Sequence, residues 1–128
     1  MKKLQQTYHI KATVKKVWQA LVDPKQIDEW GGGPAKMDAK VGTRFECWGG
    51  DIHGTNTEVV KEKKLVQDWF SGDWPEPSRV TFTLQPEEGG TKVVLVHEKV
   101  PDNEFEDIRQ GWRDYYLGPM KEWLESMT

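Results

Sequence analysis

The sequence contains a single cysteine, Cys47, among its 128 residues, so the chain cannot form an internal disulfide. It also lacks a long apolar run: the longest, residues 93–96, is far shorter than the roughly 20 residues that cross a bilayer as a helix. The basic residues at the N-terminus lead into Gln5 and Gln6 instead of the apolar core of a signal peptide. These absences predict a soluble protein of a reducing compartment, the cytoplasm, with no membrane partner.

An excess of positive charge is also missing. Eighteen Lys and Arg residues face 21 Asp and Glu residues, which gives a net charge of −3, and no basic stripe interrupts the mixture. This excludes the electrostatic footprint of a nucleic-acid partner. The three histidines, His9, His53 and His97, have no further ligands at metal-binding spacing, and no nucleophile motif is present. We therefore expect no metal, no cofactor and no catalytic residue.

Tryptophan is the residue in excess, with seven copies against four Phe and three Tyr. Tryptophan is large and amphipathic, and it is common at recognition surfaces. The length predicts one domain, residues 1–128, with room for a substantial core.

The chain begins with a strand pattern over residues 4–12. Thr13 is then placed to cap a helix, and Asp23 with Pro24 starts a second, short helix that ends near Trp30. The first helix carries an apolar stripe at helical spacing: Val14, Val17, Trp18, Leu21 and Val22. Both helices are thus expected between the first strand and the rest of the sheet.

Alternating segments joined by glycine-rich turns predict strands over residues 43–48, 52–62, 65–71, 78–85 and 91–100. A long helix follows, for which Asn103 and Glu106 have the spacing of a capping box. Pro119 predicts a kink or break near residues 115–119. The expected fold is α+β: a curved antiparallel sheet of about six or seven strands gripping a long C-terminal helix, with a cavity between them.

Six residues are candidates for lining that cavity: Phe45, Trp48, His97, Trp112, Tyr116 and Met120. Two alternatives stay open for them. The aromatic and sulfur-bearing residues of the last helix can simply pack against the sheet. His97 can be a hydrogen-bonded histidine at the edge of the core. Cys47 is expected to be buried and to behave as a small hydrophobic residue.

Strand alternation leaves several tryptophans without a clear packing role. Trp48 is expected on the face opposite Phe45 and Cys47, unless a bulge intervenes. Trp74 stands in an irregular, proline-rich link between two strands. We therefore predict a partner-binding surface that comprises Trp69, Asp73, Trp74, Pro75 and Glu76.

Five segments, residues 30–45, 48–54, 65–69, 73–76 and 109–121, together resemble one family. In this order, and with the Gly-Trp, Tyr-Tyr and Pro of the last segment, they resemble the C-terminal domain of the activator of heat-shock protein 90 ATPase family over nearly the whole chain. The resemblance implies the helix-grip fold of the START/Bet v superfamily. It further implies either a co-chaperone role or, as in stand-alone relatives, a cavity for hydrophobic ligands.

The sequence departs from that family in two ways. The family's separate N-terminal chaperone-binding domain is not part of it. In the family, a segment similar to Trp-Arg-Phe-Lys precedes the second Trp-Pro. The corresponding residues 69–73 of this chain are Trp-Phe-Ser-Gly-Asp, so the basic residues of that segment are lost.

Three hypotheses of function follow. The first is a stand-alone co-chaperone-like domain that binds a heat-shock protein 90 type chaperone and is not an enzyme. The second is a protein that binds a hydrophobic small molecule in the cavity between sheet and helix. The third is a small-molecule enzyme that uses the same cavity, which requires converging polar groups with shifted pKa values.

Overall fold

The computed structural model describes residues 1–127. Strand β1 (Lys2–Ile10) precedes helices α1 (Val14–Val22) and α2 (Pro24–Trp30). The remaining strands follow in one run: β2 (Arg44–Cys47), β3 (Ile52–Val60), β4 (Lys64–Ser71), β5 (Ser78–Glu87) and β6 (Gly90–Val100). The C-terminal helix comprises three consecutive parts: α3 (Phe105–Gly111), the π-helix η3 (Trp112–Tyr116) and α4 (Leu117–Glu125). The predicted order of elements is confirmed. Within residues 1–127, no helix is long and apolar enough to cross a membrane.

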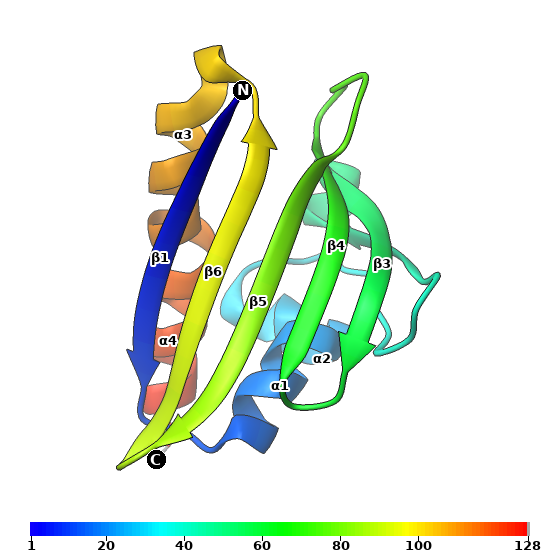
Figure 1. Ribbon diagram of the computed structural model, residues 1–128. Helices are drawn as coiled ribbons and strands as arrows, with labels where there is room; N and C mark the ends of the chain where they lie inside the picture. The colour runs from blue at the N-terminus through cyan, green and yellow to red at the C-terminus, as the bar shows by residue number, and fades with distance from the viewer. Residues whose placement is uncertain (128) are drawn as a thin grey trace.

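The six strands form one antiparallel sheet in the order β1-β6-β5-β4-β3-β2. Figure 1 shows that the sheet is curved and that the helices lie on one side of it. In this view the C-terminal helix runs behind β1 and β6. Helices α1 and α2 lie behind the other half of the sheet, on the side of β4 and β3. This α+β arrangement, in which a curved sheet grips the last helix, confirms the predicted helix-grip fold.

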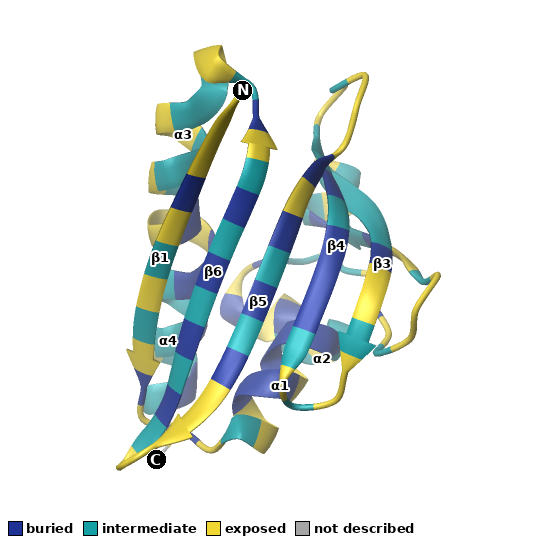
Figure 2. Cartoon of the chain, viewed as in Figure 1, coloured by how far each residue is buried: buried dark blue, intermediate teal, exposed yellow. Residues whose placement is uncertain are grey.

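Alternating burial along the central strands places the core between sheet and helices. Figure 2 shows dark and light bands in turn along β5 and β6. On β5 the buried residues Val80, Phe82 and Leu84 alternate with partly exposed threonines. Successive side chains of a strand point to opposite faces, so one face of the sheet packs against the helices.

The two N-terminal helices begin where their local sequence predicts. The Thr13 hydroxyl accepts a hydrogen bond from the Lys16 amide over 3.3 Å. The Asp23 carboxylate accepts one from the Lys25 amide over 3.0 Å, directly before Pro24. The indole of Trp30 then donates to the Ala20 carbonyl over 2.9 Å, which ties α2 to α1.

The C-terminal helix departs from α geometry close to the predicted break. Tyr116, with φ −113° and ψ −85°, ends the π-helix three residues before Pro119, which has no N–H to donate. A Cβ on Gly118 would collide with the backbone carbonyl oxygen of Arg113, so the wide turn depends on glycine at this position. The capping-box prediction is wrong: the chain passes through a 3₁₀ turn, η2 (Asp102–Glu104), and α3 starts at Phe105 without a side-chain cap.

Candidate functional site

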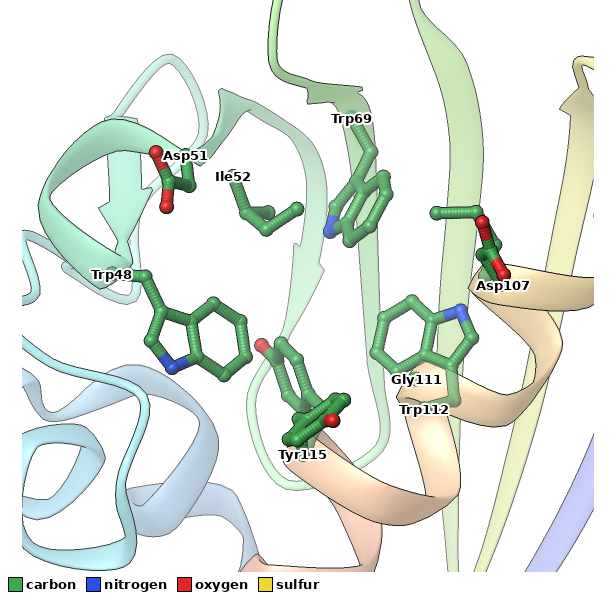
Figure 3. Close-up of a pocket in the computed structure, with 10 residues that line it drawn as sticks. Trp48, Asp51, Ile52, Trp69, Asp107, Gly111, Trp112 and Tyr115 are labelled. Carbon is green, nitrogen blue, oxygen red and sulfur yellow. The ribbon is translucent and has the colours of Figure 1, made fainter. Parts of the chain in front are cut away.

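A pocket of about 310 Å³ lies between the sheet and the C-terminal helix, and we call it the aromatic pocket. Its sheet side comprises Trp48, Asp51, Ile52 and Trp69. Its helix side comprises Asp107, Ile108, Gly111, Trp112, Tyr115 and Tyr116. Figure 3 shows these two sets of side chains facing each other across the opening. The volume lies at the lower end of the range typical of small-molecule sites.

Trp48 reaches the pocket because the backbone turns sharply after β2. Trp48 has a positive φ of 51° and begins the 3₁₀ turn η1 (Trp48–Gly50), so simple strand alternation ends at Cys47. Its ring then lies 6.4 Å from the Trp30 ring and 5.9 Å from the Tyr116 ring, between centroids. The turn therefore brings Trp48 to the helix side of the sheet, where unbroken alternation would have placed it on the other face.

The π-helix presents three aromatic side chains to the opposite wall. Trp112 and Tyr116 are buried, with ring centroids 4.6 Å apart, while Tyr115 is 67% exposed at the rim. A π-turn carries one more residue than an α-turn between hydrogen-bonded groups, and such turns often occur at functional sites. Here it changes the angular spacing of the side chains at the place where the pocket forms.

A chain of hydrogen bonds joins the helix wall to the sheet. The Trp112 indole donates to Nδ1 of His97 over 3.0 Å, and Nε2 of His97 lies 2.8 Å from the Ser78 hydroxyl. Because an indole N–H can only donate, Nδ1 is the acceptor and Nε2 carries the proton of the neutral ring. The Ser78 hydroxyl in turn donates to the Trp69 carbonyl over 2.7 Å.

Burial determines the charge state of this network and of its neighbours. It lowers the pKa of His97 from 6.5 to about 3, so the imidazole is neutral at pH 7. It also raises the pKa of the Cys47 thiol to about 12 and that of the neighbouring Tyr116 hydroxyl well above its usual value. None of these three groups is charged near neutral pH, and none is poised to exchange a proton there.

The structure separates the six residues predicted to line a cavity into two sets. Trp48, Trp112 and Tyr116 lie on the wall of the aromatic pocket. The other three lie in the packed core and do not line it: Phe45, His97 and Met120. For these three the cavity-lining prediction is corrected, because their side chains are almost completely enclosed by neighbours. For His97 the alternative of a hydrogen-bonded core histidine describes its geometry.

Sequence reasoning missed several lining residues, and two of them carry charge. Asp51 follows the glycine turn after Trp48, and Asp107 lies on α3. A usable signal existed on the helix, since Asp107, Gly111 and Tyr115 are spaced four residues apart and share one helical face. On the sheet side the signal was absent, because the turn at Trp48 is not visible in strand alternation.

The residues predicted to bind a partner lie in and near the loop between β4 and β5. Asp73, Pro75 and Glu76 are exposed. Trp74 is half-buried, with its ring 6.1 Å from that of Trp69, and its indole donates to the Glu104 carboxylate over 2.6 Å. Trp69 itself is 4% exposed, so it supports this loop from behind and cannot form part of an exposed surface without rearrangement.

Among the described residues, no group of three or more His, Cys, Asp or Glu side chains is arranged to hold a metal ion.

Residues 11–125 match the family described as "Activator of Hsp90 ATPase homolog 1-like protein". The human activator of 90 kDa heat shock protein ATPase homolog 1 is 33% identical over 91 residues, 70% of this chain and 27% of that protein. The Saccharomyces cerevisiae Hsp90 co-chaperone is 26% identical over 129 residues, 92% of this chain and 35% of that protein. The crystal structure of an HSP90 activator from Plasmodium falciparum superposes with a TM-score of 0.88 at 27% identity, covering 95% of each chain.

The sheet topology and the gripped helix define a helix-grip domain of the START-like type. The chain belongs to the Activator of Hsp90 ATPase homolog 1-like family, since the match covers most of its length. It spans about a third of the length of the curated relatives it matches.

Proposed function

We propose that this chain is a co-chaperone-like domain that binds a heat-shock protein 90 type chaperone and changes the rate of its ATPase without covalent chemistry. The family supports this, because its relatives are named as activators and co-chaperones of that chaperone. The observation that carries the proposal is the hydrogen bond from Trp74 to Glu104. It fastens the loop between β4 and β5 to the start of the C-terminal helix and leaves the acidic and proline residues of the loop facing outward.

We define the docking surface as Asp73, Trp74, Pro75 and Glu76. A half-buried aromatic ring held in place loses little freedom on binding, which is typical of residues that contribute strongly to interfaces. Asp73 and Glu76 give this surface negative charge, as does the neighbouring Glu104. We expect basic groups on the chaperone to face it.

Activation by such a domain works through a shift in population. The chaperone alternates between open and closed states, and a partner changes their ratio only if it binds one state more tightly than the other. An ATPase activator must therefore bind more tightly to the state that hydrolyses ATP. Shape and charge at the docking surface supply that difference, and no residue of this chain needs to touch the nucleotide.

The direct experiment titrates the chain into the steady-state ATPase assay of a chaperone from the same source. We expect the wild type to raise the rate and Trp74→Ala to abolish the effect. Because loss of Trp74 also removes packing, a second variant carries Asp73→Lys and Glu76→Lys at exposed positions and should lose the effect while remaining folded. Glu88→Lys combined with Glu122→Lys makes the same change of charge at exposed positions outside the docking surface and is the matched control. An ATPase rate that stays unchanged when the wild type is added would contradict the proposal.

The aromatic pocket favours a second candidate function, the binding of a small molecule with an apolar body. Aromatic rings dominate its walls, and its volume suits a small ligand. Native mass spectrometry of freshly purified protein tests this by the mass of any retained molecule. The enzyme hypothesis receives no support from Tyr116: burial raises the pKa of its hydroxyl well above the usual value, so this lining group stays protonated.

The location of the protein is part of the proposal. We propose the cytoplasm, on the basis of the reducing compartment expected for a chain whose single cysteine is buried and unpaired.

A further inference from the structure

The charges around the aromatic pocket have one sign. Two of the lining residues carry charge, Asp51 on the sheet side and Asp107 on the helix side, and no lysine, arginine or histidine lines it within the described chain. Figure 3 shows these two carboxylates on opposite sides of the group of aromatic rings. Two carboxylates placed across an opening favour a positively charged guest and disfavour an anionic one.

The rings of the pocket favour the same kind of guest. Half of the ten lining residues are aromatic: Trp48, Trp69, Trp112, Tyr115 and Tyr116. The face of an aromatic ring attracts cations, and tryptophan does so most strongly. Tyr115, which lines the pocket and is mostly exposed, extends these aromatic walls to the surface of the molecule.

An unpartnered donor marks the inner end of the pocket. The indole Nε1 of Trp69 has no hydrogen-bond acceptor among the described protein atoms, although the residue is only 4% exposed. Figure 3 shows this nitrogen on the edge of the ring that faces Ile52 and the interior of the pocket. An indole N–H can only donate, and a buried donor without a partner is unfavourable. A ligand atom that accepts this hydrogen bond would remove that cost.

We propose that the aromatic pocket binds a small organic cation whose apolar body bears a hydrogen-bond acceptor at its inner end. The positive charge lies at the rim between Asp51 and Asp107, and the acceptor receives the Trp69 indole N–H after a rotation of the Ile52 side chain. The apolar body lies between Trp48 and Trp112. This inference does not rest on chaperone binding, since every test below uses the chain alone.

Charge selectivity is tested with three probes that share one skeleton: 3-phenylpropylamine, 3-phenylpropan-1-ol and 3-phenylpropionate. The readout is the set of tryptophan indole resonances in ¹H–¹⁵N correlation spectra, with the Trp69 signal assigned by its absence in Trp69→Phe. We expect the amine to bind about tenfold more tightly than the alcohol and the carboxylate to bind most weakly, with the advantage of the amine shrinking at high salt.

Variants assign the selectivity to the rim. Asp51→Asn combined with Asp107→Asn should reduce the advantage of the amine over the alcohol to about threefold or less, while leaving binding of the alcohol unchanged. Glu88→Gln combined with Glu122→Gln removes the same amount of charge at exposed positions outside the pocket and should leave the advantage intact. Equal effects of the two pairs would show that net charge alone is responsible and would overturn the rim assignment.

The inner acceptor is tested with a second pair of amines, which carry a para-methoxy or a para-ethyl group on the ring. The methoxy probe offers an ether oxygen where the ethyl probe has a methylene, so it should bind about fivefold more tightly and shift the Trp69 indole proton downfield. In Trp69→Phe the two probes should bind equally. The proposal is overturned if the alcohol or the carboxylate binds as well as the amine, or if no probe moves the Trp69 resonance.

Discussion

Trp112 on the π-helix and His97 on β6 are joined by a hydrogen bond of 3.0 Å, in which the indole donates to the imidazole. The bond crosses from the gripped helix to the sheet, and it continues through Ser78 to the Trp69 carbonyl. Trp69 and Trp112 are also stacked at 5.3 Å between centroids, and both line the aromatic pocket. The same contacts that hold the helix in place thus position two walls of the candidate site.

Acid should weaken the fold through His97. Burial lowers its pKa from 6.5 to about 3, so the unfolded chain binds this proton more readily than the folded one. The contribution of the neutral ring is therefore complete above pH 6.5 and is lost as the pH falls toward 3. In that window the free energy of unfolding should fall by up to about 1.4 kcal/mol per pH unit on account of this group. Urea unfolding at a series of pH values measures it.

The control for this prediction is His97→Gln, which keeps a polar side chain but cannot titrate. We expect the variant to be less stable at neutral pH. Its free energy of unfolding should also change less with pH than that of the wild type, by the amount that the uptake of one proton contributes. Parallel curves for the two proteins would show that His97 does not govern acid sensitivity.

Because of the π-helix, we expect opposite effects of the same substitution at two glycines on either side of it, Gly111 and Gly118. Gly118→Ala would push a methyl group into the Arg113 carbonyl oxygen and should lower the free energy of unfolding by about 2 kcal/mol or more. Gly111→Ala meets no atom within 4 Å in a helical conformation and should raise it by about 0.5–1 kcal/mol. Chemical denaturation of the two variants side by side provides the measurement. Equal stabilisation by both would mean that the helix is α throughout.

Much of the fold was predictable because its signals are local. Thr13 and Asp23 cap their helices from adjacent positions, and the strand segments alternate as expected. Two features could not be read this way. The turn that redirects Trp48 depends on a positive φ that a tryptophan rarely adopts. The start of the last helix at Phe105 depends on the path of the chain through η2 and not on the capping-box spacing.

The candidate site was predictable only in part, for a related reason. Helical spacing correctly indicated that Trp112 and Tyr116 face the sheet, and both line the pocket. Whether a residue facing inward touches a pocket or solid core depends on packing across elements, which separates Tyr116 from Met120 although both lie on the same helix. Packing across elements also decides the position of His97, which is completely buried and accepts a hydrogen bond from Trp112.

The loop between β4 and β5 should be held by the Trp74–Glu104 hydrogen bond. A double-mutant cycle of Trp74→Phe and Glu104→Ala should give a coupling energy of about 1 kcal/mol, since the bond involves a charged acceptor at a partly exposed position. Hydrogen exchange of the loop amides gives an independent readout and should quicken in either single variant. A coupling energy near zero would show that loop and helix are ordered independently.

The proposed function requires that the chain bind one state of a heat-shock protein 90 type chaperone in preference to another. The most direct measurement is its dissociation constant for the chaperone, determined by calorimetry once without nucleotide and once with a non-hydrolysable ATP analogue. We expect at least about tenfold tighter binding in the presence of the analogue, with the gain lost in the variant carrying Asp73→Lys and Glu76→Lys. Equal affinity in the two nucleotide states, or no binding in either, would contradict it.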